Sequence, residues 1–183
     1  MKPTTQSVQR LAEIPLFEQF KEEEIGQLAE IVEPLDFQPG EIVLHQGRCS
    51  QNLWIVLEGV CEVVTQPDSQ DSTIVLAELK RNNHFGEMSF FHAAPHSASV
   101  RAKTALRLLR IEKSRYDTLI NGNCSAAYKL AYNTVDSLAD RLRRMDEWVT
   151  ELLMAEDSVS ASGSADLTEW SLLRENVFGN WSL

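Results

Sequence analysis

The 183-residue sequence has little cysteine, and its cysteines are far apart. There are only three, Cys49, Cys61 and Cys124. An odd number without CxxC spacing fits neither a disulfide framework nor a paired-cysteine metal site. It also falls short of the four thiolates that an iron–sulfur cluster needs. We therefore expect unreactive thiols and no metal or other cofactor.

Long hydrophobic runs are also missing. Apolar residues make up 43% of the chain, but the longest uninterrupted runs are only a few residues. A membrane-spanning helix needs about 20. The opening segment MKPTTQSVQR lacks the apolar core of a secretory signal peptide. These absences predict a cytoplasmic protein with no membrane association.

Positive charge is scarce over most of the chain. The net charge is −10, which argues against nucleic acid as the main partner because phosphate neutralisation dominates such binding. Residues 80–115 are the exception, with eight Lys and Arg against Glu87 and Glu112, or +6. Two interpretations remain open. The segment could attract a small anionic ligand, or its cations could alternate outward along strands into solvent.

The order of patterns along the chain predicts an α+β fold. Residues 7–32 have the apolar spacing of short helices, with Ile25, Leu28, Ile31 and Val32 in one run that Pro34 ends. From Leu35 to Ile111, short runs rich in Val, Ile and Leu alternate with turn residues. That spacing is typical of an all-β sandwich or barrel and not of βαβ units. After Ser114 the pattern is helical.

One long helix is expected over residues 124–156, capped by Asn123 or Ser125. It carries an apolar seam spaced by four and three residues: Ala131, Val135, Leu138, Leu142, Met145, Val149 and Leu152. Such a seam could pack on the β-domain of its own chain. Its narrowness favours pairing with a second copy instead, so we predict a homodimer through residues 131–152.

The C-terminal residues 157–183 have a different composition. A Ser-rich linker, SVSASGSAD, precedes an apolar tail with two Trp and one Phe. The tail over residues 166–183 is too apolar for a free disordered end. Two alternatives remain, folding back on the domain or binding a protein partner.

The stretch FGEMSFFHAAPHSASVRA, residues 85–102, has the chemistry of a ribose-phosphate site. Gly86 permits close approach of the backbone to a ligand. Glu87 lies among apolar residues and needs a donor such as a sugar hydroxyl. The segment EMSFF could begin a helical turn with free N–H groups, and Ser97, Ala98 and Ser99 are small enough for their N–H groups to face a phosphate.

This stretch resembles the phosphate-binding cassette of the cyclic nucleotide-binding domain family. The pattern of that family is Phe-Gly-Glu, a short apolar helix, Pro-Arg and then small residues. The glycines Gly40, Gly47 and Gly59 and the segment IPLFEQF are also similar to the family, and to the sensor domains of bacterial cyclic-AMP receptor proteins. The resemblance covers about residues 10–155. It implies a jelly-roll-like β-barrel (a double-stranded β-helix) with N-terminal helices and a long C-terminal helix.

The resemblance also implies the ligand and its contacts. The ligand would be a cyclic nucleotide, cAMP or cGMP, with Glu87 accepting from the ribose 2′-hydroxyl. Gly86, Ser97 and Ala98 would contact the cyclic phosphate, and the long helix would cap the base. The implied ligand-binding residues are Phe85, Gly86, Glu87, Met88, Ser89, His96, Ser97, Ala98 and Ser99.

One departure from the family pattern concerns the phosphate. The phosphate-binding Arg of the family falls on His96 here, and histidine is only partly protonated near neutrality, whereas arginine carries a permanent planar charge. Three interpretations follow. The pocket could still bind a cyclic nucleotide, weakly or with pH dependence. It could bind another ligand, or it could be empty in a protein-interaction module. Asn82, in place of a usual Gly, tolerates a left-handed backbone.

The expected function is that of a regulatory module and not of an enzyme. His45, His84, His92 and His96 lack metal-site spacing, and Ser97 has no evident catalytic base. The residues after Glu156 show no basic recognition helix, so a DNA-binding domain is not expected. We predict a stand-alone domain, with the β-roll over residues 1–123, that signals to a partner protein through its C-terminal helix. The alternative is a degenerate fold that acts as a ligand-independent scaffold.

Overall fold

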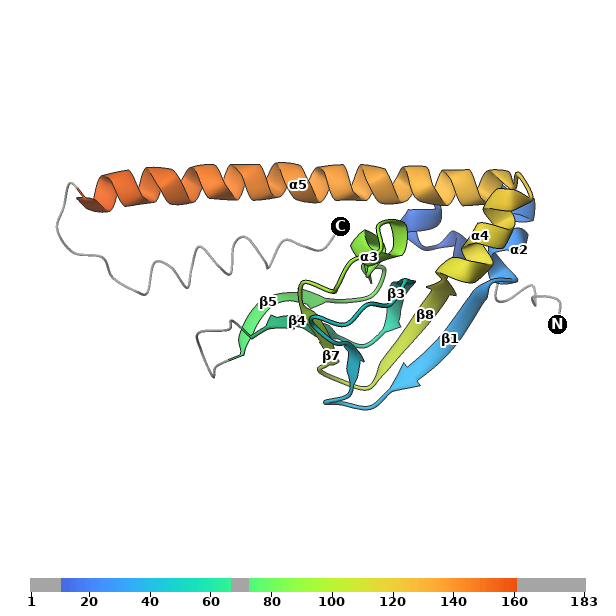
Figure 1. Cartoon of the computed structure of the whole chain (residues 1–183), viewed down its shortest axis with the longest axis horizontal. Coiled ribbons are helices and arrows are strands. Elements are labelled where there is room, and N and C mark those ends of the chain that lie inside the picture. The colour runs from blue at the N-terminus through green and yellow to red at the C-terminus, as the bar shows by residue number, and fades with distance from the viewer. Residues whose placement is uncertain (1–10, 67–72, 161–183) are drawn as a thin grey trace.

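The computed structural model describes residues 11–66 and 73–160, with the backbone alone for residues 152–160. Short helices, a β-domain and one long helix follow one another along the chain (Figure 1). The helical elements are η1 (Pro15–Phe17), α2 (Glu22–Ala29), α3 (Glu87–Phe91), α4 (Lys113–Asn121) and α5 (Ser125–Ser160). The predicted helical lead-in and long C-terminal helix are confirmed.

The described strands form two antiparallel sheets of four strands each. The first has the order β1-β8-β3-β6, from β1 (Val32–Phe37), β8 (Leu106–Glu112), β3 (Asn52–Glu58) and β6 (His84–Phe85). The second has the order β2-β7-β4-β5, from β2 (Ile42–Leu44), β7 (Ser99–Ala102), β4 (Cys61–Thr65) and β5 (Ile74–Leu79). The predicted jelly-roll-like α+β fold is confirmed, as two facing sheets that do not close into a barrel.

Two apolar cores lie on opposite faces of the first sheet. Trp54 and Val56 of β3 face the second sheet, where they meet Val100 and other buried residues of β2, β4, β5 and β7. Leu53 and Ile55 of the same strand face the helices, because successive side chains of a strand point to opposite faces. The strand is therefore buried on both faces, and its sequence NLWIVLE is a continuous apolar run for that reason.

The first helix ends earlier than its apolar spacing predicts. Helix α2 stops at Ala29, and Val32 already begins β1, so the prediction of one helical run through Val32 is wrong. Pro34 lies inside β1 and pairs with Leu109 of β8. Strand β1 is at the edge of its sheet, where the missing N–H of proline costs no ladder hydrogen bond.

Helix α5 contacts its own domain through a face other than the predicted seam. The side chains that α5 buries are Ala126, Ala127, Leu130, Thr134 and Ser137. By contrast, Val135 and Leu142 of the seam are 60% and 59% exposed, and Met145 and Val149 are also exposed. The alternative that the whole seam packs on its own β-domain is therefore wrong for these positions.

Candidate ligand-binding site

The candidate pocket begins at the turn between β6 and α3. Phe85 is buried, and its ring stacks on Trp54 of β3 with the centroids 6.2 Å apart. Gly86 has φ 84°, a left-handed conformation that suits glycine. A Cβ at Gly86 would lie 2.5 Å from the carbonyl oxygen of Asn52. The close approach that requires glycine is thus to β3, whereas the sequence argument assigned it to a ligand.

Glu87, the first residue of α3, carries a buried carboxylate that is only 4% exposed. Its Oε1 accepts a hydrogen bond from Nη1 of Arg141 on α5 at 2.5 Å. Its Oε2 is buried and meets no donor among the described residues. A buried acceptor without a donor costs free energy. The site therefore suits a ligand that supplies a hydroxyl or amide donor.

Arg141 joins α5 to both elements that flank the turn. Its Nη2 donates to the carbonyl oxygen of His84 at 2.8 Å, beside its ion pair with Glu87. Burial, and secondarily the charge of Arg141, lowers the pKa of His84 to about 3. His84 is therefore a neutral residue of the structure. Sequence reasoning did not find Arg141, because no local pattern distinguishes it from the other charged residues of the helix.

His96 is held between two serine hydroxyls and is only 7% exposed. Its Nε2 lies 2.7 Å from Oγ of Ser50, and its Nδ1 lies 2.9 Å from Oγ of Ser89. Burial also lowers the pKa of His96 below its ordinary value of 6.5. The imidazole is therefore neutral at neutral pH, and both ring nitrogens are occupied. The structure thus shows no cation at the position where the family pattern has arginine.

The other predicted residues differ in their accessibility. Met88 is 66% exposed, and Ser97 is exposed on the segment before β7. Ala98 is half-buried. The hydroxyl of Ser99 accepts a hydrogen bond from the backbone N–H of Gln46 at 2.9 Å. The structure thus brings the 96–99 segment against the chain that follows β2, while Met88 points to solvent.

The basic segment of residues 80–115 is largely neutralised by ion pairs. Seven of its eight cations contact carboxylates, and the pairs are Arg81–Glu13, Arg101–Glu62, Lys103–Glu78, Arg107–Asp36, Arg110–Glu33, Lys113–Asp117 and Arg115–Glu112. Three of the partners, Glu62, Asp36 and Glu33, lie on the strand that pairs with the strand of the cation. Of the two interpretations of this charge, the structure favours outward-facing side chains over a general anion site.

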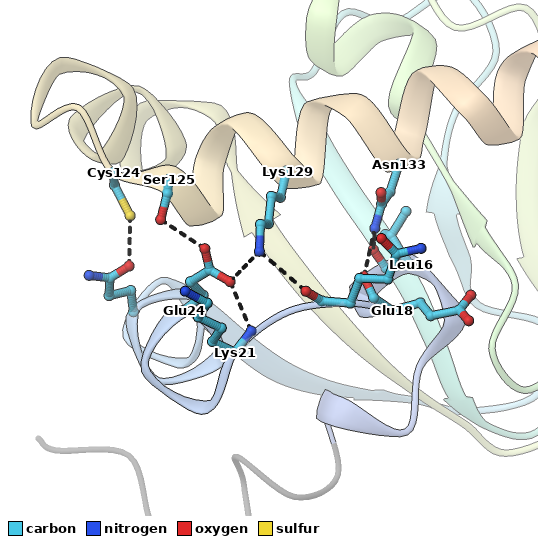
Figure 2. Close-up of polar contacts among 10 residues, drawn as sticks. Leu16, Glu18, Lys21, Glu24, Cys124, Ser125, Lys129 and Asn133 are labelled. Atoms are coloured by element: carbon cyan, nitrogen blue, oxygen red, sulfur yellow. Dashed lines mark hydrogen bonds and ion pairs between the residues drawn. The ribbon is translucent and has the colours of Figure 1, made fainter.

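A group of polar contacts fixes the start of α5 to α2 and η1 (Figure 2). Glu24 of α2, 6% exposed, accepts from Lys129 at 2.7 Å, from Ser125 at 2.9 Å and from the backbone N–H of Lys21 at 2.8 Å. Asn133 donates to the carbonyl oxygen of Leu16 at 2.9 Å. We call Glu24, Ser125, Lys129 and Asn133 the polar latch. Its hydrogen bonds, that of Lys129 above all, lower the pKa of Glu24 to about 2.

Two negative findings concern the described residues alone. No cluster of three or more His, Cys, Asp or Glu in residues 11–66 and 73–160 could hold a metal ion. In the same ranges, no helix combines the length and the apolarity that a membrane span requires.

Comparisons with known proteins agree with the fold. The model of the cyclic nucleotide-binding domain family matches residues 34–123. The chain is 26% identical over 110 residues to a cAMP-dependent protein kinase regulatory subunit of Schizosaccharomyces pombe. That match covers 60% of this chain and 26% of the relative, so the chain aligns with only about a quarter of that protein.

Solved structures show the same fold. A cyclic nucleotide-binding domain from Methylobacillus flagellatus superposes with a TM-score of 0.66 at 18% identity, covering 88% of this chain and 85% of that one. The regulatory subunit of a cAMP-independent protein kinase A from Trypanosoma cruzi, bound to guanosine, superposes with a TM-score of 0.57 at 24% identity, covering 70% and 48%. Residues 34–123 thus match the cyclic nucleotide-binding domain family, and these solved structures share the fold of this chain.

Proposed function

We propose that the domain binds a cyclic nucleotide, cAMP or cGMP, and signals the occupancy of its pocket to a partner protein through α5. The observation that carries this proposal is that the two oxygens of the Glu87 carboxylate have different surroundings. One oxygen is bound to Arg141 of α5, and the other has no donor in the described part of the chain. A ribose hydroxyl that donates to Glu87 would change the surroundings of the same group that holds α5.

The proposed pocket consists of the residues that the sequence singled out. They are Phe85, Gly86, Glu87, Met88, Ser89, His96, Ser97, Ala98 and Ser99. Glu87 would recognise the ribose, and the backbone of Ser97 and Ala98 would approach the cyclic phosphate. We propose no catalytic step and no metal in this pocket.

Calorimetric titration with cAMP, cGMP and cyclic di-GMP tests the binding. We expect wild-type protein to bind at least one of them and Glu87→Gln to weaken that binding at least about tenfold, because a hydrogen bond to a charged group is lost. Glu23→Gln, an exposed glutamate of α2, is the matched control and should bind as wild type does. No heat of binding from any of the three up to millimolar concentration would contradict the proposal.

Signalling through α5 has its own test. Ligand must interact unequally with two states of the helix for any signal to result. Amide hydrogen exchange over residues 135–160, measured with and without saturating nucleotide, should change at a fixed temperature and pH. Unchanged exchange in protein that binds nucleotide would reject the signalling proposal and leave the binding proposal intact.

We also propose that α5 pairs with a second copy of the chain through residues 131–152. Six large apolar side chains are exposed on its described part: Tyr128, Tyr132, Val135, Leu142, Met145 and Val149. Sedimentation should show a dimer, and Leu142→Glu with Val149→Glu should give a monomer, whereas Thr150→Glu should not. A monomeric wild type would overturn the pairing. A protein partner for the tail over residues 166–183 is a further proposal, and this tail lies outside the described residues.

The second candidate function is a ligand-independent scaffold. The neutral His96 and the Arg141–Glu87 ion pair favour it, since both occupy groups that a nucleotide would need. Silence in all the titrations would support the scaffold, and if His96→Arg then created nucleotide binding, the pocket would be a degenerate one.

A further inference from the structure

The pocket lacks a cation at the place where its phosphate would lie. His96 is neutral and bound to two hydroxyls. The next cations along the chain are also occupied, because Arg101 is bound to Glu62 at 2.7 Å and Lys103 is paired with Glu78. A cyclic phosphate carries a negative charge and is poorly held without a positively charged donor. Another part of the fold has to supply one if such a ligand binds.

The chain that follows β2 runs directly beside this segment. Leu44 of β2 pairs with Val100 of β7. Beyond β2, the N–H of Gln46 donates to the hydroxyl of Ser99, and the N–H of Gly47 donates to the carbonyl oxygen of His96 at 2.9 Å. The N–H of His96 in turn donates to the carbonyl oxygen of Arg48 at 2.9 Å. Arg48 is therefore joined through its backbone to the residue just before Ser97.

Arg48 has a side chain that is available for a ligand. The residue is exposed, and its guanidinium makes no hydrogen bond or ion pair with a described residue. Arginine stays charged at all physiological pH values and presents a planar fork that matches phosphate oxygens. Arg48 thus differs from Arg101 of β7 and from Lys103, which follows that strand, because both are paired.

The contacts of His96 hold the backbone of Arg48. Ser50 binds the imidazole on one side and Ser89 of α3 binds it on the other, so His96 connects the loop of residues 45–51 to the cassette. An arginine at position 96 would add a second cation to the same loop contact, and like charges repel. A neutral residue at position 96 and a cation at position 48 are therefore compatible with each other.

We propose that Arg48 supplies the positive charge for the cyclic phosphate and that His96 positions Arg48 without contacting the phosphate as a cation. The inference rests on the proposed function and assigns the phosphate contact of the same pocket to a residue of another loop. The recognised group is the cyclic phosphate of cAMP or cGMP, and the ribose and base would be recognised separately.

Calorimetry with Arg48→Ala tests the inference. We expect cyclic nucleotide to bind about tenfold more weakly than to wild type, which corresponds to about 1.4 kcal/mol. Arg48→Lys should lose less, because it keeps the charge without the fork. Arg81→Ala is the matched control. It removes an exposed arginine that pairs with Glu13, and it should leave the affinity unchanged. Arg48→Ala with His96→Arg should recover part of the affinity, because the cation is then supplied from position 96.

Two further measurements separate a phosphate contact from a structural role. The difference between wild type and Arg48→Ala should shrink as salt rises, because it is electrostatic. Adenosine and guanosine, which lack the phosphate, should bind both proteins equally or neither. An equal loss for nucleosides and cyclic nucleotides would overturn the inference and assign Arg48 a structural role.

The inference and the proposed function fail in different ways. Wild-type binding with Arg48→Ala unchanged would overturn the inference alone. A wild type that binds no cyclic nucleotide at millimolar concentration would overturn both.

Discussion

The domain holds two segments of α5 in different ways. The first segment, residues 125–134, buries Ala126, Ala127 and Leu130 and carries the helix residues of the polar latch. The second segment, from residue 135 onward, exposes Val135 and Leu142, and its Arg141 forms an ion pair with Glu87. Burial and several shared hydrogen bonds thus hold the first segment, whereas contacts of Arg141 inside the candidate pocket hold the second.

This difference means that one segment of α5 is anchored to the domain, while the other is held at the candidate pocket. A segment that is held by a buried apolar core stays in place over the whole range in which the domain is folded. Under the proposed function, a nucleotide that competes for Glu87 would alter the contact that holds the second segment. The first segment accordingly has buried apolar residues, and the second has an exposed apolar seam and Arg141.

The largest expected difference between the two segments of α5 is in how much their apolar side chains contribute to stability. Leu130→Ala removes a side chain that is fully buried and should lower the free energy of unfolding by about 2–5 kcal/mol. Leu142→Ala removes a side chain that is 59% exposed and should change it by less than about 0.5 kcal/mol. Urea denaturation of both variants at low protein concentration measures the difference. Equal losses of unfolding free energy would show that the second segment also packs on its own domain.

A smaller difference is expected for the charged contacts. Glu24→Gln weakens the polar latch and should cost about 1–3 kcal/mol, because Lys129 keeps some contact with water. Asp140→Asn removes an exposed partner of Arg143 in the second segment and should lower the free energy of unfolding by less than about 0.5 kcal/mol. Thermal unfolding at one pH compares the two. If Glu24→Gln unfolds as wild type does, the latch does not stabilise the attachment.

The dependence of stability on pH gives a more gradual effect. The pKa of Glu24 is lowered to about 2 from 4.5, so its stabilisation is complete above about pH 4.5 and is lost as pH falls toward 2. The pKa of His84 is lowered to about 3 from 6.5, so its contribution is complete above about pH 6.5 and is lost below that value. Each group contributes a slope of at most about 1.4 kcal/mol per pH unit.

Glu24 belongs to the polar latch, and His84 lies beside Arg141. The pH at which each slope begins therefore distinguishes the two contacts of α5 with the domain. Unfolding free energies measured from pH 7 to pH 3 should fall first through His84, beside Arg141, and then also through Glu24. His84→Gln should reduce the decline between pH 6.5 and pH 4.5, to which His96 also contributes because burial lowers its pKa as well. Glu24→Gln should reduce the decline below pH 4.5. A decline above pH 4.5 that is undiminished in His84→Gln would assign it to other groups.

Much of the fold and of the cassette could be predicted from the sequence, because both depend on local pattern. The turn residues between apolar runs indicate the strands, and the left-handed φ of 72° at Asn82 agrees with the tolerance expected of asparagine. The end of α2 was mispredicted, since Ile31 and Val32 fit a helical and an extended pattern equally well. Strand β1 prevails because Val32 pairs with Ile111 of β8, about 80 residues away.

The site contacts that could not be predicted join residues far apart in the sequence. Arg141 reaches Glu87 across 54 positions, and Ser50 reaches His96 across 46. Neither has a local signature, because arginine on an exposed-looking helix and serine in a loop are ordinary. The sequence therefore identified the residues of the cassette and the unusual His96, but not what each of them contacts.

The length of α5 has a mechanical consequence. The helix ends at Ser160, so at 1.5 Å per residue it extends about 40 Å beyond Asn133, the last residue of the latch. A tilt of about 10° about that point would move the far end by about 7 Å, which exceeds the rise of one helical turn, about 5.4 Å. Under the proposed function, a displacement of a few ångströms at Arg141 would therefore become a larger displacement at Ser160.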